Sequence, residues 1–192
     1  MSSSFGLMNV PSLKDKPAVT EEEAKMIWNA AMKPMIAMLT KVLWYTGLRI
    51  SEALALTTVS LQRDGMDFKL QVMTEKAGKI KGQSKPDALP IPHMLGLDLV
   101  DYIRQHCSPG NLLFPIHRST AWRQIRKCAE LSGLPNWREI HPHSFRHGFV
   151  YDKASKGVHP YVLTKLARHR DLKTTLAYYR PTDKDLRDAM ER

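Results

Sequence analysis

The chain has 192 residues, 43% of them hydrophobic, which suits one folded domain with a sizeable core. Lys and Arg outnumber Asp and Glu by 29 to 19, so the net charge is +10. This balance favours a polyanionic partner such as nucleic acid, although a merely basic globular protein would also show it. Two cysteines are too few for a disulfide framework, and no apolar run is long enough to span a membrane or act as a secretory signal. We therefore expect a cytoplasmic protein with reduced thiols.

Helical patterns dominate the first third of the chain. The Ser-, Lys- and Pro-rich segment 1–17 is predicted to be a flexible arm or leader. Thr20 and Glu23 then have the spacing of a capping box, which opens a helix. Pro34 interrupts or restarts that helix, and the apolar periodicity that follows stops at Gly47. The next stretch, "LRISEALAL", predicts another short helix.

The middle of the chain predicts a small β-element. A turn signal at 64–65 precedes Phe68, Leu70 and Val72, which alternate with more polar neighbours, and "ALPIP" at 88–92 reads as a returning strand. Helices are then predicted over 94–106, 119–132, 142–156, 159–168, 171–180 and 183–191. The predicted fold class is mainly α with a small antiparallel β-sheet (α+β).

Two stretches combine arginine with other polar residues. In "YTGLRISE", Arg49 follows a helix stop and Glu52 comes three residues later. In "HPHSFRH", His143 and Arg146 have the spacing of one helix face. A surface ion pair at Arg49 would contribute only about 0.3–0.5 kcal/mol, and the three histidines of the second stretch would otherwise be polar surface or metal ligands. No second Cys/His cluster completes a ligand set, so we predict no metal.

Two further stretches are rich in lysine and tyrosine. "LARHRDLKTTLAYYR" sets His169 nine residues before Tyr178, which is followed by Tyr179. An arbitrary tyrosine pair is far more often part of a core. "TEKAGKIKGQSK" would otherwise be a solvated loop. Its four lysines are Lys76, Lys79, Lys81 and Lys85.

Taken together, these residue types suit attack on a phosphodiester without a metal or nucleotide cofactor. Arginine forks match the non-bridging phosphate oxygens and stabilise the charge of the transition state. Histidine titrates near neutral pH and can accept a proton from a phenol. Lysine can protonate the leaving 5′-oxygen. Tyrosine attacks and keeps the phosphate as an ester, so the bond energy is conserved and the strand can be rejoined.

The same stretches resemble a known family. "TGLRISEAL", "HPHSFRHGF" and "LARHRDLKTTLAYY" are similar to three boxes of the catalytic domain of tyrosine recombinases, the phage-integrase and Xer-type site-specific recombinases. The resemblance covers residues 18–192 and implies the fold of the DNA breaking-rejoining enzymes. The family's spacing of nine selects Tyr178 rather than Tyr179 as nucleophile, and its hairpin lysine corresponds best to Lys76. The implied catalytic residues are Arg49, Lys76, His143, Arg146, His169 and Tyr178.

The resemblance also implies an activity and partners. The expected activity is site-specific cleavage and rejoining of double-stranded DNA through a 3′-phosphotyrosyl intermediate, by a nucleoid-associated protein that is a monomer alone and a tetramer on DNA. Type IB topoisomerase-like relaxation, or DNA binding without catalysis, remain alternatives, although no catalytic position is visibly replaced.

Three departures from the family stand out. Arg168 occupies a position that is usually Gly, where it would crowd the helix or add a phosphate contact. The connection after Lys76 is long and holds the three other lysines. No N-terminal core-binding domain precedes residue 18, so we expect either an excised fragment or a naturally minimal protein.

Overall fold

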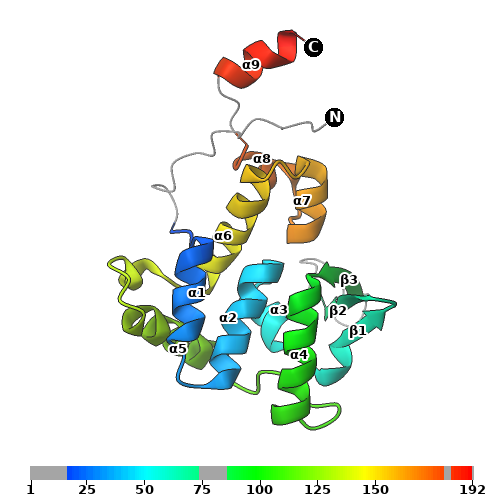
Figure 1. Ribbon diagram of the computed structural model, residues 1–192, viewed down its shortest axis with the longest axis vertical. Helices are drawn as coiled ribbons and strands as arrows, with labels where there is room; N and C mark the ends of the chain where they lie inside the picture. The colour runs from blue at the N-terminus through cyan, green and yellow to red at the C-terminus, as the bar shows by residue number, and fades with distance from the viewer. Residues whose placement is uncertain (1–16, 74–85, 180–182, 192) are drawn as a thin grey trace.

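The computed structural model describes residues 17–73, 86–179 and 183–191 (Figure 1). The predicted arm therefore lies almost wholly outside the described residues. The helices are α1 (Glu21–Asn29), α2 (Pro34–Thr46), α3 (Ile50–Leu54), α4 (His93–His106), α5 (Arg118–Leu131), α6 (Pro142–Ser155), α7 (Pro160–Ala167), α8 (Leu172–Leu176) and α9 (Asp183–Met190), with two 3-10 turns, η2 (Thr58–Ser60) and η3 (Trp137–Glu139). The strands are β1 (Leu61–Asp64), β2 (Asp67–Met73) and β3 (Pro86–Ile91).

Helix α2 is the centre of the larger hydrophobic core. It starts with Pro34 at its first turn, where the missing N–H costs no hydrogen bond, and it ends at Gly47 in the left-handed conformation (φ 60°). Buried side chains such as Leu39 and Leu43 cover it on several sides, because α1, α4, α5 and α6 all pack against it. This packing places the end of α2 in the interior of the molecule.

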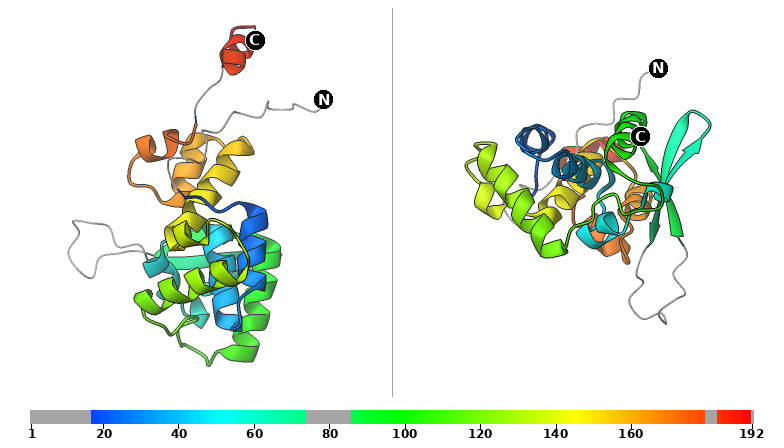
Figure 2. Two further views of the ribbon diagram at one scale, coloured as in Figure 1. Left: turned by 90° about the vertical axis from the view of Figure 1, so that its left-hand side faces the viewer. Right: turned by 90° about the horizontal axis from the view of Figure 1, so that it is seen from below.

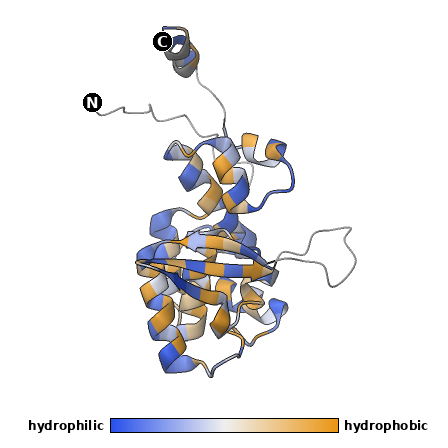
Figure 3. Ribbon diagram, turned by 90° about the vertical axis from the view of Figure 1, so that its right-hand side faces the viewer, coloured by the Kyte–Doolittle hydropathy of each residue, from blue (hydrophilic) through white to orange (hydrophobic). Residues whose placement is uncertain are grey.

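The three strands form an antiparallel sheet in the order β1-β2-β3. Figure 3 shows hydrophobic and hydrophilic segments alternating along the strands, and Phe68, Leu70 and Val72 of β2 are the buried set. Helix α4 covers this face at close range, because a Cβ atom at Gly96 would lie 2.1 Å from the ring of Phe68. The sheet is therefore attached to the helical body through β2.

A second, smaller core lies between α6, α7 and the turn after α8. Its buried members are Phe149, Val150, Ala154, Leu163, Ala167 and Tyr178. Figures 1 and 2 show α7 and α8 at one end of the body, beside the C-terminal half of α6, while α9 extends away from them. Helix α6 contributes to both cores, with Phe145 in the larger one and Phe149 in the smaller. The seam between the two cores runs along α6.

The structure confirms the predicted fold class and most of the local signals. The Thr20–Glu23 capping box forms, Gly47 ends α2, and the turn signalled at 64–65 occurs at Gly65 and Met66, between β1 and β2. The helix predicted over 171–180 was too long, because α8 ends at Leu176 and Tyr178 lies in the turn that follows. No helix in the described ranges is long and apolar enough to cross a membrane.

Candidate active site

Arg49 lies at the junction between α2 and α3. The left-handed turn at Gly47 redirects the chain, and Arg49 becomes the N-cap residue of α3. Its backbone N–H donates to Oε2 of Glu52 over 2.7 Å, and its Nη1 contacts Oε1 of the same carboxylate at 3.0 Å. The ion pair that the sequence allowed as an alternative does form, but it is not a surface pair, because Glu52 is only 6% exposed while the Arg49 side chain is 38% exposed. The guanidinium is thus fixed at one edge and open to solvent at the other.

Arg146 is buried where three segments meet. Its Nη1 donates to the carbonyl of Gly47 over 2.6 Å, and its Nη2 donates to the carbonyl of Ala167. The side chain therefore joins the end of α2 to the end of α7. Burial, followed by the charges of Arg49 and Arg168, lowers the pKa of Arg146 to about 10, so its guanidinium stays charged at neutral pH.

Three histidine rings follow one another from His141, the N-cap residue of α6, into the helix. The ring centroids of His141 and His143 are 6.3 Å apart, and those of His143 and His147 are 6.5 Å apart. Burial lowers the pKa of His143, and the neighbouring charges of His141 and Arg146 lower it further. His143 and Arg146 thus lie close enough to interact, as their i,i+3 spacing predicts.

The row of rings ends at Tyr178. Its hydroxyl lies 2.6 Å from Nδ1 of His147, and the ring of Tyr151 packs edge-on against it with centroids 4.7 Å apart. Tyr178 is 6% exposed, and burial raises the pKa of its phenol to about 12, with Arg146 opposing the shift. The phenol is therefore protonated at neutral pH and needs a proton acceptor. The hydroxyl of the adjacent Tyr179 instead donates to the carbonyl of Val158.

His169 lies near the arginines, and its ring contacts a threonine hydroxyl. Within the described part of the chain, its Nδ1 contacts Oγ1 of Thr175 at 2.8 Å, and Thr175 lies 2.8 Å from the hydroxyl of Thr164. Burial lowers the pKa of His169 to about 4, assisted by the charges of Arg146 and Arg49. A neutral imidazole next to two guanidiniums suits hydrogen bonding to an anion.

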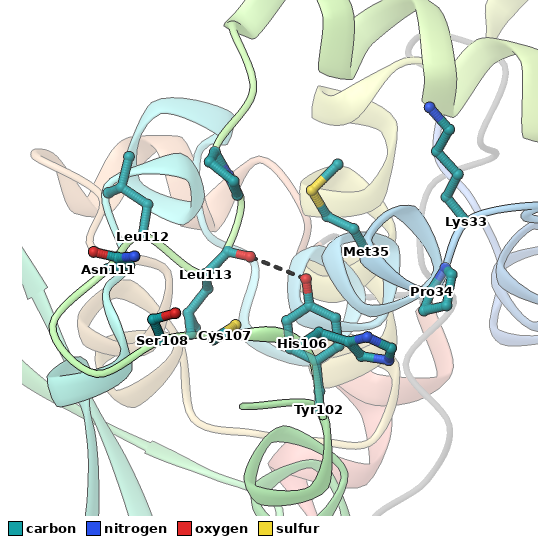
Figure 4. Close-up of a pocket in the computed structure, with 11 residues that line it drawn as sticks. Lys33, Pro34, Met35, Tyr102, His106, Cys107, Ser108, Asn111, Leu112 and Leu113 are labelled. Atoms are coloured by element: carbon teal, nitrogen blue, oxygen red, sulfur yellow. Dashed lines mark hydrogen bonds between the residues drawn. The ribbon is translucent and has the colours of Figure 1, made fainter. Parts of the chain in front are cut away.

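Figure 4 shows a separate hollow of about 540 Å³, which lies at the opposite end of α2 from Gly47. It is formed by the start of α2, the end of α4 and the loop before α5. Tyr102 is one of the residues that line it, and its hydroxyl already donates to the carbonyl of Leu113 over 3.0 Å. The hollow has no combination of residues comparable to the arginine, histidine and tyrosine cluster, so we do not assign the chemistry to it.

A sequence model of the phage integrase family matches residues 17–185, which include all of these side chains. The chain belongs to the phage integrase family. The curated proteins that resemble it include tyrosine recombinase XerA of Pyrococcus furiosus, 28% identical over 186 residues, and tyrosine recombinase XerD of Yersinia pestis, 29% identical over 154 residues. The matches cover 91% of this chain and 61% of XerA, and 72% of this chain and 47% of XerD.

Solved structures of recombinases share the fold. A XerH site-specific recombinase bound to difH substrate superimposes with a TM-score of 0.74 at 17% identity, over 91% of this chain and 53% of that one. The Tn1549 transposon integrase in complex with transposon right end DNA superimposes with a TM-score of 0.73 at 20% identity, over 92% of this chain and 66% of that one. The integrase-family chain therefore spans about half to two thirds of these relatives.

Five of the six predicted site residues fall within the described ranges of this integrase-family chain. Arg49 and Arg146 both act electrostatically on His143 and His169, and Tyr178 interacts with Arg146, so the structure brings the five together. Lys76 lies outside the described residues, as do the alternatives Lys79, Lys81 and Lys85, and its role stays a prediction. Among the described residues, no three His, Cys, Asp or Glu side chains form a group able to hold a metal ion.

Two residues of this site were not predicted as functional. His147, which contacts the Tyr178 hydroxyl, is four residues after His143 and so shares its helix face, a signal that the sequence did contain. Arg168 reaches Glu52 across 116 residues of sequence, and no local pattern indicates that contact.

Proposed function

We propose that this chain cleaves and rejoins double-stranded DNA at specific sites, with Tyr178 as the nucleophile. The observation that carries the proposal is the position of the Tyr178 hydroxyl, 2.6 Å from an imidazole nitrogen and within the electrostatic reach of Arg146. A tyrosine serving only as core would not require this surrounding of cationic and titratable groups.

The proposed reaction is a pair of transesterifications. In the first, the Tyr178 oxygen attacks the scissile phosphorus, the bond from phosphorus to the 5′-oxygen breaks, and a 3′-phosphotyrosyl ester and a free 5′-hydroxyl result. In the second, a 5′-hydroxyl attacks the phosphotyrosyl ester and releases the tyrosine. Each step exchanges one phosphoester bond for another, so no nucleotide is consumed and no metal is called for.

The reaction needs two proton transfers, one from the phenol and one to the leaving 5′-oxygen, and we assign them to His147 and Lys76. The phenol, with a pKa of about 12, loses its proton as it attacks, and Nδ1 of His147 is within hydrogen-bond distance to receive it. The leaving 5′-oxygen gains a proton, for which Lys76 remains the candidate. We propose that Arg49, Arg146, His143 and His169 hold the non-bridging oxygens and stabilise the charge of the transition state.

The proposed partners are double-stranded DNA and further copies of this chain. The charge of +10 favours DNA binding through the phosphates. Helix α9 extends away from the body and keeps Leu186 and Met190 exposed, which suits contact with a neighbouring copy (Figure 1). We propose a monomer in dilute solution, a tetramer on DNA, and a location with the nucleoid.

The test is covalent capture on a nicked suicide substrate followed by a denaturing gel. Tyr178→Phe should abolish the protein–DNA adduct, because only the nucleophilic hydroxyl is removed. Tyr179→Phe is the matched control: it loses a hydrogen bond to Val158, a cost of about 1 kcal/mol, and should still form the adduct. Adduct formation by the first variant and not by the second would contradict the assignment.

The same assay separates the alternatives. A wild-type chain that binds DNA but forms no adduct would be a non-catalytic relative. A chain that forms adducts and relaxes supercoiled plasmid, yet never joins strands from two sites, would be a topoisomerase-like enzyme.

A further inference from the structure

Arg168 adopts a backbone conformation that usually requires glycine. It follows the last residue of α7 with φ 52° and ψ 43°, and it is the one residue other than glycine with positive φ in the described ranges. A Cβ atom is disfavoured in this region, so a side chain persists there when other contacts hold it. The contacts of Arg168 should therefore explain its presence.

The Arg168 side chain points into the protein and is only 6% exposed. Its Nη2 contacts Oε2 of Glu52 at 3.0 Å, and its Nη1 donates to the carbonyl of Leu166 over 3.0 Å. Its Nε has no hydrogen-bond partner among the described residues. A buried guanidinium on a strained backbone, with one donor unsatisfied, is an unfavourable combination unless its charge is required there.

The Glu52 carboxylate is shared between two arginines. It accepts from the backbone and the Nη1 of Arg49 and from the Nη2 of Arg168. Burial alone would raise the pKa of Glu52, yet the pKa lies below its usual value, and the charge of Arg168 is the largest contribution in that direction. Both arginines therefore stabilise the charged form of this carboxylate, and Arg168 does so from the other end of the sequence.

This arrangement changes the charge available at the active site. One carboxylate paired with Arg49 alone would neutralise it, whereas the group of Glu52, Arg49 and Arg168 keeps a net charge of +1. The remaining edge of Arg49 is open to solvent, while Arg168 is enclosed. The positive charge is thus available on the arginine that an incoming phosphate can reach.

We propose that Arg168 is a positioning residue, which pairs with Glu52 so that Arg49 can direct its charge and its open donors at the scissile phosphate. The inference rests on the proposed function of DNA cleavage. The contact also joins the N-terminus of α3 to the end of α7, next to the place where Arg146 joins Gly47 to Ala167.

The test compares Arg168→Gly, Glu52→Gln and the double variant in the full chain. The measured quantity is the rate constant of covalent adduct formation on a suicide substrate at saturating DNA. Arg168→Gly should slow adduct formation by on the order of 10- to 100-fold, because Arg49 is then neutralised and drawn toward Glu52. The double variant should recover most of that loss, since the carboxylate that Arg168 balances is gone.

Several controls keep the outcomes distinct. Failure of the wild-type chain to form adducts would refute the proposed function itself, whereas a wild-type rate in Arg168→Gly would refute only the role of Arg168. Arg104→Ala removes a cation from an exposed ion pair with Asp101 and should leave the rate unchanged, which excludes a general charge effect. An equally slow double variant, or a loss explained by weaker DNA binding, would overturn the proposal.

A second pair of variants covers the case in which Arg168→Gly does not fold. Arg168→Lys keeps a cation next to Glu52. Arg168→Met removes the cation but keeps an unbranched side chain of similar length. Thermal unfolding establishes that both are folded before the rates are compared. Adduct formation should be close to the wild-type rate in the lysine variant and slow in the methionine variant, and equal rates would contradict the role of the charge.

Discussion

Buried charge is concentrated on a few side chains around the end of α7. Arg146, Arg168 and Glu52 are each about 6% exposed, yet they comprise two cations and one anion. A positive excess held away from water interacts more strongly with an approaching anion than the same charge on the surface, because the local dielectric is lower. These residues therefore contribute to the packing of the protein, and they suit the phosphate binding that we propose.

Two substitutions at Arg168 allow the free-energy cost of its left-handed backbone to be measured separately from the effect of losing the guanidinium. Arg168→Ala and Arg168→Gly both remove the charged group, but only alanine keeps a Cβ atom in the left-handed region. We expect the glycine variant to be more stable than the alanine variant by about 1 kcal/mol. Urea unfolding of the two variants measures the difference, and equal stability would mean that the backbone relaxes out of this conformation.

Stability should fall in mild acid because of His169. Its pKa is lowered from 6.5 to about 4, so between these values the unfolded chain binds a proton that the folded chain does not. The free energy of unfolding therefore decreases as the pH falls through this window. The lowered pKa of His143 acts in the same direction. Urea midpoints measured from about pH 7 to about pH 4.5 should drop less steeply in His169→Asn than in the wild-type chain; an unchanged slope would contradict the burial of this ring.

At the level of elements, α6 both carries residues of the candidate site and packs closely against two other segments. It carries His143, Arg146 and His147 on one side, and on another it packs against α2 and against Val19, in the segment before α1. Gly148 permits this approach, because a Cβ atom there would lie 2.0 Å from the backbone oxygen of Val19 and 2.6 Å from the ring of Trp44. The side chains of the site depend on this close contact for their position.

Gly148→Ala should consequently destabilise the protein. In an open helix the change would stabilise by about 0.5–1 kcal/mol, but overpacking against a backbone atom costs about 1–3 kcal/mol. We expect the second effect to prevail, with a lower urea midpoint and slower adduct formation. A stabilised variant would show that the segment around Val19 moves aside at little cost.

At the level of the whole molecule, the proposed nucleophile and the proposed phosphate-binding residues lie together within one chain. Tyr178 is buried in the smaller core of its own chain, with its hydroxyl on His147 of the same α6 that carries Arg146. This geometry favours cleavage in cis, in which each chain attacks the phosphate that its own arginines hold.

Mixing two inactive variants distinguishes cis from trans cleavage. Tyr178→Phe lacks the nucleophile and Arg49→Ala lacks a phosphate-binding group, so a cis mechanism predicts no adduct from the mixture, as from either variant alone. A mixture of wild type with Tyr178→Phe, which should still form adducts, establishes that mixed assemblies are active. Adducts from the doubly inactive mixture would favour donation of the tyrosine to a neighbour.

The sequence predicted what depends on local interactions. The Thr20–Glu23 cap, the stop at Gly47 and the turn at 64–65 each involve residues within a few positions of one another, and each forms as expected. The length of α8 was not predicted. Thr175 turns its hydroxyl toward His169 and Thr164, and the helix gives way to a turn within two residues.

Residue type and spacing were enough to select the candidate site residues, but they did not predict the contacts that these residues make. The sequence singled out Tyr178 over Tyr179, and their hydroxyls do have different environments, one on His147 and the other on a backbone carbonyl. The partners themselves, His147 for Tyr178 and Glu52 for Arg168, are 31 and 116 residues away. Contacts at such separations follow from how α6, α7 and α3 pack, which no local pattern contains.

The turn that holds Tyr178 also connects the phenol to the helix that follows in the sequence, α9. The backbone N–H of Tyr178 is bonded to the carbonyl of Thr175, three residues back, so the tyrosine follows the last turn of α8 rather than lying within a longer rigid helix. Only four residues separate it from the start of α9. Because so few residues of sequence separate the phenol from α9, we expect a contact that displaces this helix also to shift the proposed nucleophile.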